Sequence, residues 1–302
     1  MAELILHHFD ASPFAEKARL AMGLKGLSWH SVDIPMVMPK PDLMPLTGGY
    51  RKTPVLQIGA EVYCDTSLIL RELDRRFPAR PLFPGAPGLS LALSAWSDKT
   101  FFEPGAALSM GLNDEIPDPI LADRKDFFEF MDFSQLKSSM PHMWGQFLAQ
   151  VQLLEEELSD GRDFMFGDQP CGADILCYFP LWMARGNFPQ VGERLQDFDR
   201  VRAWEQRMQA IGHGDRSEMA PADALAVARL YEPAPGDGVF ANEEGLKQGD
   251  RVQVAPTDYG AVPVSGSLMA LNHRQLTLRR EESATGPINT HFPRSGYRVS
   301  KT

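Results

Sequence analysis

Ser12 and Pro13 stand where a short apolar run, residues 4–9, gives way to a helical pattern. A serine hydroxyl in this position can cap the helix by accepting a hydrogen bond from a backbone N–H. It can also donate a hydrogen bond to a bound thiolate, whose charge the helix dipole favours by about 0.3–1 kcal/mol. Two roles are therefore open for Ser12, helix cap and donor to an anionic sulfur.

Cysteine chemistry is not expected at this turn. Residues 10–22 contain no cysteine, so dithiol–disulfide exchange there is excluded. The three cysteines of the chain, Cys64, Cys171 and Cys177, form no CxxC pair and are too few for a disulfide framework. We therefore expect a reducing, cytoplasmic location and interpret Cys64 as a buried strand residue.

The adjacent histidines, His7 and His8, do not form a metal site in this interpretation. Successive side chains of a strand point to opposite faces, so two neighbouring imidazoles cannot hold one ion together. We assign both histidines, with Gln57, to the surface or edge of a strand. No metal cofactor is expected.

Two further motifs each have a plain structural role beside a binding role. Lys52, Thr53 and Pro54 open a strand pattern, where proline is tolerated at the first residue and a loop lysine is usually solvated. Asp65 and Thr66 begin a helical pattern, and either residue would serve as its N-cap. Taken alone, neither motif decides between the two roles.

The ordered set of motifs at Ser12 and at residues 52–56, 65–69 and 167–174 resembles the cytosolic glutathione transferase family, across about residues 1–215. The resemblance implies a thioredoxin-like domain that binds glutathione as cosubstrate. It also implies a helical domain that helps to build the pocket for a small-molecule electrophile. Members of this family are usually homodimers, so a homodimer is expected.

The resemblance also implies roles for single residues. Ser12, which stands where the related glutaredoxins carry a cysteine, would stabilise the glutathione thiolate. The Thr53–Pro54 peptide bond would be cis and would turn the backbone of Thr53 toward the bound peptide. The protein would then be an enzyme in which glutathione is the nucleophile and the chain supplies positioning and electrostatics.

The remaining binding positions depart in part from the family pattern. Asp65 and Thr66 stand in place of a Glu-Ser pair, which holds the γ-glutamyl group of glutathione. Lys52, with Arg51 nearby, could pair with the glycine carboxylate. Because of these substitutions, the alternative is a non-catalytic glutathione-binding or regulatory protein on a transferase scaffold.

The elements that must position these residues begin with a region over residues 1–84. A strand over residues 4–9 leads to a helix over 13–25, in which Phe14 and Met22 lie on one arc with Glu16 and Arg19 opposite. A second strand, a hairpin and a second helix follow, over residues 29–34, 54–59, 61–64 and 65–77. This β-α-β, β-β-α order is typical of a thioredoxin-like fold.

Residues 88–231 are expected to be helical throughout, with two apolar stripes that we interpret as the core of a bundle. Cys171 and Asp174 have the spacing of a capping box, weakened because cysteine is a poor acceptor. After a linker at 232–244, the apolar period changes to two, which predicts a small β-barrel over 245–302. The fold class is therefore multidomain: α/β, then all-α, then small β.

Charge is unevenly distributed along the chain. The net charge is −10, but residues 245–302 hold eight Lys/Arg against four Asp/Glu, a net charge of +4, which leaves −14 for residues 1–244. The net negative charge of the whole chain and the few aromatic residues of the tail argue against nucleic acid as a partner. The basic tail could dock on the acidic body or a second subunit, bind an anionic partner, or be solvated. We favour docking or a protein partner, and expect no membrane-spanning helix.

Overall fold

The computed structural model describes residues 2–85 and 87–302. The first region has the expected order of elements, with one short additional helix, α2, in the loop after β2. Its elements are β1 (Ile5–His8), α1 (Pro13–Lys25), β2 (Ser28–Asp33), α2 (Met44–Thr47), β3 (Val55–Ile58), β4 (Glu61–Cys64) and α3 (Thr66–Arg76). The thioredoxin-like prediction is confirmed.

Helix α1 begins and ends at the residues that its sequence indicates. Pro13 occupies the first turn, and the Ser12 Oγ accepts a hydrogen bond from the Ala15 N–H at 3.2 Å. The helix ends at Gly26, whose φ of 64° is left-handed. The polar side of α1 is buried as well as the apolar side, because α8 packs against it: Glu16 and Arg19 are each 2% exposed and pair with each other.

The assignment of His7, His8 and Gln57 to a strand surface or edge is wrong. Strand β1 lies inside the sheet, between β2 (parallel) and β3 (antiparallel), so it is not an edge strand, and all four of its residues are buried. The His7 Nε2 is 2.8 Å from the Gln57 Oε1, and the His8 Nε2 is 3.0 Å from the Ser31 Oγ. Burial lowers the pKa of His7 to about 4 and that of His8 to about 3.

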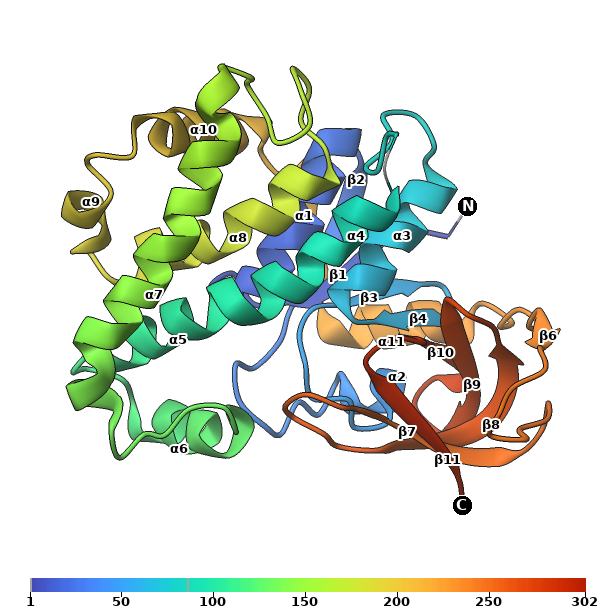
Figure 1. Cartoon of the computed structure of the whole chain (residues 1–302). Helices are drawn as coiled ribbons and strands as arrows, with labels where there is room; N and C mark the ends of the chain where they lie inside the picture. The colour runs from blue at the N-terminus through green and yellow to red at the C-terminus, as the bar shows by residue number, and fades with distance from the viewer. Residues whose placement is uncertain (1, 86) are drawn as a thin grey trace.

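The second region is a bundle that covers one side of α1 and α3 (Figure 1). The predicted stripes form its core, in which Phe147, Val151, Trp204 and Met208 are fully buried. Its elements are α4 (Pro87–Ala95), the π-helical η1 (Trp96–Phe101), α5 (Phe102–Gly111), α6 (Asp118–Phe127), α7 (Leu136–Glu157), the 3-10 turn η2 (Leu158–Asp160), α8 (Gly172–Asn187), α9 (Val191–Arg194) and α10 (Asp199–Ile211).

The expectation of helix throughout residues 88–231 is wrong at one place. Strand β5 (Asp215–Glu218) pairs in parallel with β2 and extends the sheet of the first region. Helix α11 (Pro221–Arg229) then lies against that sheet, where the Gln57 Nε2 donates to the Ala224 carbonyl at 2.8 Å. The bundle therefore ends with α10, and the chain returns to the thioredoxin-like part before the linker.

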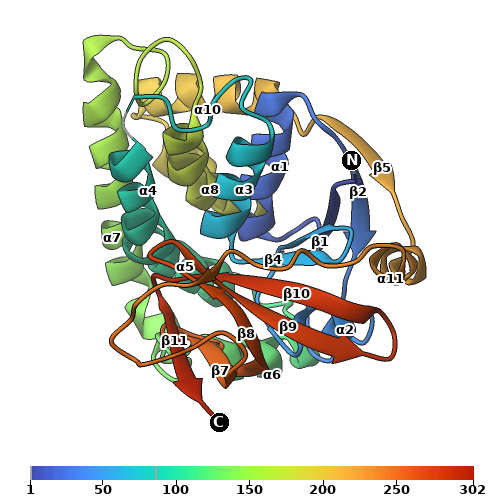
Figure 2. The same cartoon turned by 90° about the vertical axis from the view of Figure 1, so that its right-hand side faces the viewer.

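The C-terminal strands are present, but their pairing differs from a separate closed barrel. They are β6 (Gly238–Val239), β7 (Arg251–Pro256), β8 (Val264–Leu271), β9 (Gln275–Glu282), β10 (Gly286–Pro293) and β11 (Tyr297–Lys301). The main strand order runs β11-β7-β8-β9-β10 and continues directly into β4-β3-β1-β2-β5. Figure 2 shows β10 beside β4. Strands β7–β11 with their loops, residues 245–302, are called the C-terminal β unit below.

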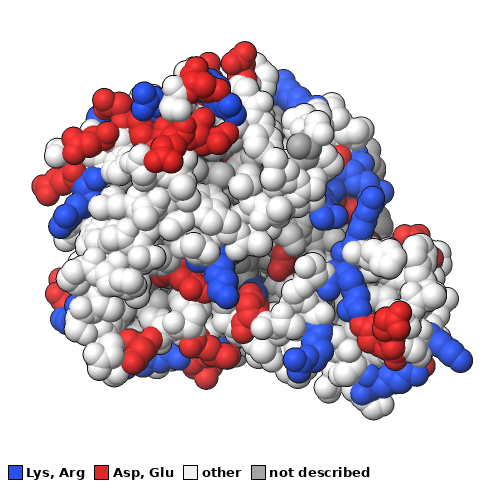
Figure 3. Space-filling view, in the orientation of Figure 1, with Lys and Arg blue, Asp and Glu red and all other residues white. Residues whose placement is uncertain are grey.

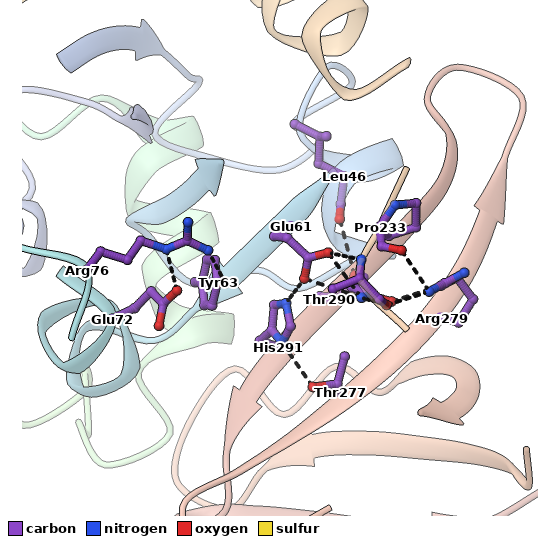
Figure 4. A network of polar contacts seen from close by, with 12 residues as sticks. Leu46, Glu61, Tyr63, Glu72, Arg76, Pro233, Thr277, Arg279, Thr290 and His291 are labelled. Atoms are coloured by element: carbon purple, nitrogen blue, oxygen red, sulfur yellow. Dashed lines mark hydrogen bonds and ion pairs between the residues drawn. The ribbon is translucent and has the colours of Figure 1, made fainter. Parts of the chain in front are cut away.

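A polar network at the β4–β10 seam joins the C-terminal β unit to the first region (Figure 4). The Glu61 Oε2 is 2.5 Å from the His291 Nε2, and the Asn289 amide donates to both Glu61 oxygens. Burial acts to raise the pKa of Glu61, but these hydrogen bonds outweigh it and leave the pKa lowered. Apolar side chains of both parts pack together beneath the seam, among them Val62 and Ile288.

Candidate active site

Three loops meet at one edge of the sheet. Ser12 follows β1, Thr53 precedes β3, and Asp65 follows β4. The register sets their proximity, because His7 pairs with Val55 across β1–β3 and Cys64 pairs with Val55 across β3–β4. The three residues that the sequence singles out therefore lie around one point.

Two helices begin at this edge, and both are capped by a side chain of the predicted site. Ser12 caps α1, and the Asp65 Oδ1 accepts from the Ser67 N–H at 2.9 Å and from the Ser67 hydroxyl at 2.6 Å at the start of α3. Asp65 has a φ of 79°, a conformation that few non-glycine residues adopt. Two positive helix ends facing one edge favour a ligand with negative charge.

A cavity of about 260 Å³ opens beside these helix ends, between the first region and the bundle. Ser12, Lys52 and Thr53 line it, whereas Asp65 and Thr66 are not among its lining residues. Most of its wall is apolar and comes from both parts of the chain, including Phe9, Phe14, Met38, Phe102, Phe128 and Met183. On the face shown in Figure 3, the surface is hollowed between the bundle and the C-terminal β unit, with both basic and acidic side chains at the border.

Lys40 is a lining residue that the sequence did not single out. Its Nζ donates to the Thr53 Oγ1 at 2.8 Å and to the Arg51 carbonyl at 3.2 Å. Burial, with the nearby Arg124 and Arg51 guanidinium groups, lowers the pKa of Lys40 to about 8. Arg51 itself is engaged by Asp123 and Asp126. The sequence offered no signal for Lys40 beyond a lysine between two prolines.

Lys52 and Asp65 are both in contact with the C-terminal β unit. The Lys52 Nζ lies 2.5 and 2.6 Å from the two Asp258 carboxylate oxygens and 4.3 Å from the centre of the Tyr259 ring. The Tyr297 hydroxyl donates to the Asp65 Oδ2 at 3.0 Å. No local pattern in the sequence points to these partners, because they lie about 200 residues away along the chain.

The remaining predictions near the edge agree with the structure. The Thr53–Pro54 bond is cis, and so is the Met38–Pro39 bond. Cys64 is fully buried in β4, and burial raises the pKa of its thiol well above the usual range, so it is not a reactive thiol. In the bundle, the Asp174 Oδ2 closes the capping box by accepting from the Cys171 N–H at 2.9 Å.

The comparisons with known proteins agree with this geometry. Residues 6–81 match the family model for "Glutathione S-transferase, N-terminal domain", and residues 125–207 match that for "Glutathione S-transferase, C-terminal domain". A GST-like protein from Pseudomonas syringae, solved at 2.4 Å, is 39% identical, with both chains covered completely and a TM-score of 0.82. The chain belongs to the glutathione S-transferase family. The match to the Pseudomonas syringae protein extends over the C-terminal β unit as well as the two family domains.

More distant members of the family share part of the chain. Glutathione S-transferase U3 of Arabidopsis thaliana is 32% identical over 78 residues, which are 26% of this chain and 35% of that relative. Glutathione S-transferase U1 of the same plant is 29% identical over 209 residues, which are 65% of this chain and 84% of that relative. The Tau class enzyme of mango, 14% identical over 76% of this chain and 96% of its own with a TM-score of 0.54, shows the fold alone.

Two classes of feature are absent from the described residues. No helix within residues 2–85 and 87–302 is long and apolar enough to cross a membrane. The same residues contain no group of three or more His, Cys, Asp or Glu side chains that could hold a metal ion.

Proposed function

We propose that the protein is a glutathione transferase that directs the glutathione thiolate at an electrophilic carbon. The observation that carries the proposal is the position of Ser12, which caps α1 and lines the cavity beside the cis Thr53–Pro54 bond. Because the Ser12 oxygen accepts the cap hydrogen bond, its O–H hydrogen can be donated to a sulfur. A hydrogen bond to a charged acceptor contributes about 1.5–3 kcal/mol, enough to favour the thiolate at neutral pH.

The polar groups of the edge match the other parts of glutathione. The Thr53 backbone would pair with the cysteinyl residue, and Asp65 with Thr66 would hold the γ-glutamyl group. Lys40 is a better candidate than Lys52 for an ion pair with the glycine carboxylate, because the charge of Lys52 is already neutralised by Asp258. The apolar wall of the cavity would hold the electrophile, and the bundle supplies Phe102, Phe128 and Met183 to it.

Replacing Ser12 with alanine tests the thiolate role. Ser12→Ala should lower kcat/KM for a model electrophile by about tenfold to hundredfold, the rate equivalent of about 1.5–3 kcal/mol, while changing the affinity for S-methylglutathione little. The thiol pKa of bound glutathione, followed by ultraviolet absorbance, should rise in the variant.

Ser109→Ala is the matched control. Ser109 also lines the cavity, but its hydroxyl donates to the Gly105 carbonyl within α5. The control should retain both the turnover and the thiol pKa of the parent protein. Equal loss of turnover in the two variants, or an unchanged thiol pKa in Ser12→Ala, would contradict the role of Ser12.

A non-catalytic glutathione-binding protein is the second candidate. It is favoured by the engagement of Lys52 and Asp65 by the C-terminal β unit. Binding of glutathione without turnover of any electrophile in a broad panel would support this candidate over the enzyme. We also propose a homodimer that acts in the cytoplasm, which sedimentation analysis and fractionation of cells would test.

A further inference from the structure

A chain of two hydrogen bonds runs from the buried Tyr50 to the Asp65 carboxylate. The Tyr297 hydroxyl is 2.9 Å from the Tyr50 hydroxyl and donates to the Asp65 Oδ2 at 3.0 Å. Since Tyr297 has a single hydroxyl hydrogen and Asp65 receives it, the Tyr50 hydroxyl is the donor to Tyr297. The direction of both hydrogen bonds is therefore fixed, and both point toward Asp65.

The packing around the two tyrosines leaves them little freedom. Tyr50 is 2% exposed and Tyr297 is 6% exposed. The Phe292 ring packs against both, 5.8 Å from the Tyr50 ring and 5.6 Å from the Tyr297 ring, measured between centroids. Burial raises the pKa of both tyrosines well above the usual range, so both keep their hydrogens at neutral pH.

The Asp65 carboxylate is held at both oxygens. Ser67 donates twice to the Oδ1, and Tyr297 donates to the Oδ2. An ionised carboxylate offers about four acceptor sites, so these three hydrogen bonds fix its orientation and leave it able to accept one more. The remaining acceptor site suits a cationic donor such as an ammonium group.

We propose that Tyr297 is a positioning residue for the glutathione site: it orients the Asp65 carboxylate toward the α-ammonium group of the γ-glutamyl residue. The C-terminal β unit is then a working part of the binding site and not only a covering of the β4 edge. This inference rests on the proposed binding of glutathione. It adds to that function a residue from outside the two family domains, which end at residue 207.

Tyr297→Phe removes the hydroxyl and keeps the buried ring. Titration calorimetry should compare two ligands, glutathione and glutaryl-cysteinyl-glycine, which lacks only the α-amino group. The parent protein should prefer glutathione by about tenfold or more, the ratio to which about 1.4 kcal/mol corresponds. In Tyr297→Phe the affinity for glutathione should fall by about fivefold to tenfold, less than for loss of a direct hydrogen bond to a charged group, because Tyr297 acts on the ligand only through Asp65. The affinity for the glutaryl peptide should stay unchanged.

Two further variants separate positioning from a general effect on folding. Tyr178→Phe makes the same change at a tyrosine that is 2% exposed in α8 and bonds to Gln209, outside the cavity lining. It should leave the preference between the ligands unchanged. Tyr50→Phe, which removes the donor to Tyr297, should reduce the preference in the same direction but by a smaller factor.

The outcomes distinguish this inference from the function on which it rests. Binding of neither ligand by the parent protein would overturn the proposed function, and this inference with it. If the parent prefers glutathione and Tyr297→Phe keeps the full preference, or weakens both ligands equally, only the positioning role is overturned. A parent that binds the two ligands equally would show that Asp65 does not receive the ammonium group.

Discussion

At the scale of single residues, Lys40 is the lysine of the cavity lining whose protonation is altered by its surroundings. Among the described residues, no carboxylate oxygen lies within ion-pair distance of its Nζ, and its hydrogen bonds go to neutral oxygens. Burial lowers the pKa of Lys40 to about 8, so the ammonium form is lost just above neutral pH. A bound carboxylate would favour the ammonium form and raise that pKa.

This titration predicts how binding depends on pH. The affinity for S-methylated glutaryl-cysteinyl-glycine, which has neither a thiol nor an α-amino group to ionise, should be constant below about pH 7 and fall above about pH 8, by at most tenfold per pH unit for one required proton. Calorimetry in buffers of different ionisation enthalpy should show proton uptake on binding near pH 8–9. Lys40→Met should bind weakly at every pH and lose this dependence. Lys52→Met, which changes the lysine paired with Asp258, should retain the pH dependence of binding. If the affinity of Lys40→Met still falls above about pH 8, the titrating group is not Lys40.

Local sequence was informative about Ser12, Thr53 and Asp65, because each is adjacent to a strand or helix end that its own neighbours specify. Lys40 lies in an irregular loop, where no period or cap indicates which way a side chain points. Tyr297, the first residue of β11, meets Asp65 only because β10 pairs with β4 and thereby joins the C-terminal β unit to the first region. That contact depends on pairing between strands far apart in sequence, which a local pattern does not encode.

At the scale of elements, the loop between β7 and β8 connects the C-terminal β unit with the bundle. Tyr259 packs at 5.0 Å from the Phe127 ring and 5.9 Å from the Phe128 ring, measured between centroids. Gly260 follows with a φ of 62°, and a Cβ added there would lie 2.5 Å from the Phe127 Cε2. Glycine is therefore required at this position both by the backbone conformation and by the approach to α6.

Gly260→Ala should consequently destabilise the protein more than backbone strain alone does. Gly286→Ala is the matched control, because Gly286 also has a positive φ, 70°, with no atom within 4 Å of an added Cβ. Both variants should lose about 1 kcal/mol or more for the left-handed conformation, and Gly260→Ala should lose a further amount for displacing Tyr259 from Phe127. Urea unfolding measures both losses. In a Phe127→Ala background, the additional loss of stability in Gly260→Ala should disappear. Equal losses of stability in Gly260→Ala and Gly286→Ala would contradict this prediction, because they would show that the loop accommodates the added methyl group.

Both sides of α1 are buried because the helix is enclosed between the sheet and the bundle. The arc of Phe14 and Met22 was a sound indication of a helix with an apolar side. The pattern did not indicate that α8 covers the polar side as well, where Glu16 and Arg19 satisfy each other. A helix enclosed between a sheet and a bundle needs internal ion pairs for its polar residues, and these are not distinguishable by sequence from solvated ones.

At the scale of the whole molecule, the C-terminal β unit docks on the body without the charge attraction that its composition suggested. The tail is basic and the body is acidic. Among the described residues, however, one ion pair of Lys or Arg with Asp or Glu joins residues 1–231 to residues 245–302. This pair is Lys52–Asp258, in which the tail supplies the acidic residue. Docking rests on the parallel β4–β10 pairing and on a shared apolar core. Neither interaction depends on net charge.

The two modes of docking differ in their response to salt. At about 1 M salt the Debye length is about 3 Å, so a tail held by the overall charge difference would be released, whereas strand pairing and apolar burial would persist. Hydrogen exchange of the full chain should therefore show the amides of β4 and β10 equally protected in dilute buffer and in 1 M sodium chloride. The exposed turn at residues 295–296, between β10 and β11, provides an internal reference for rapid exchange. Loss of β10 protection in high salt would mean that charge holds the unit, and the Tyr297–Asp65 contact would then vary with ionic strength.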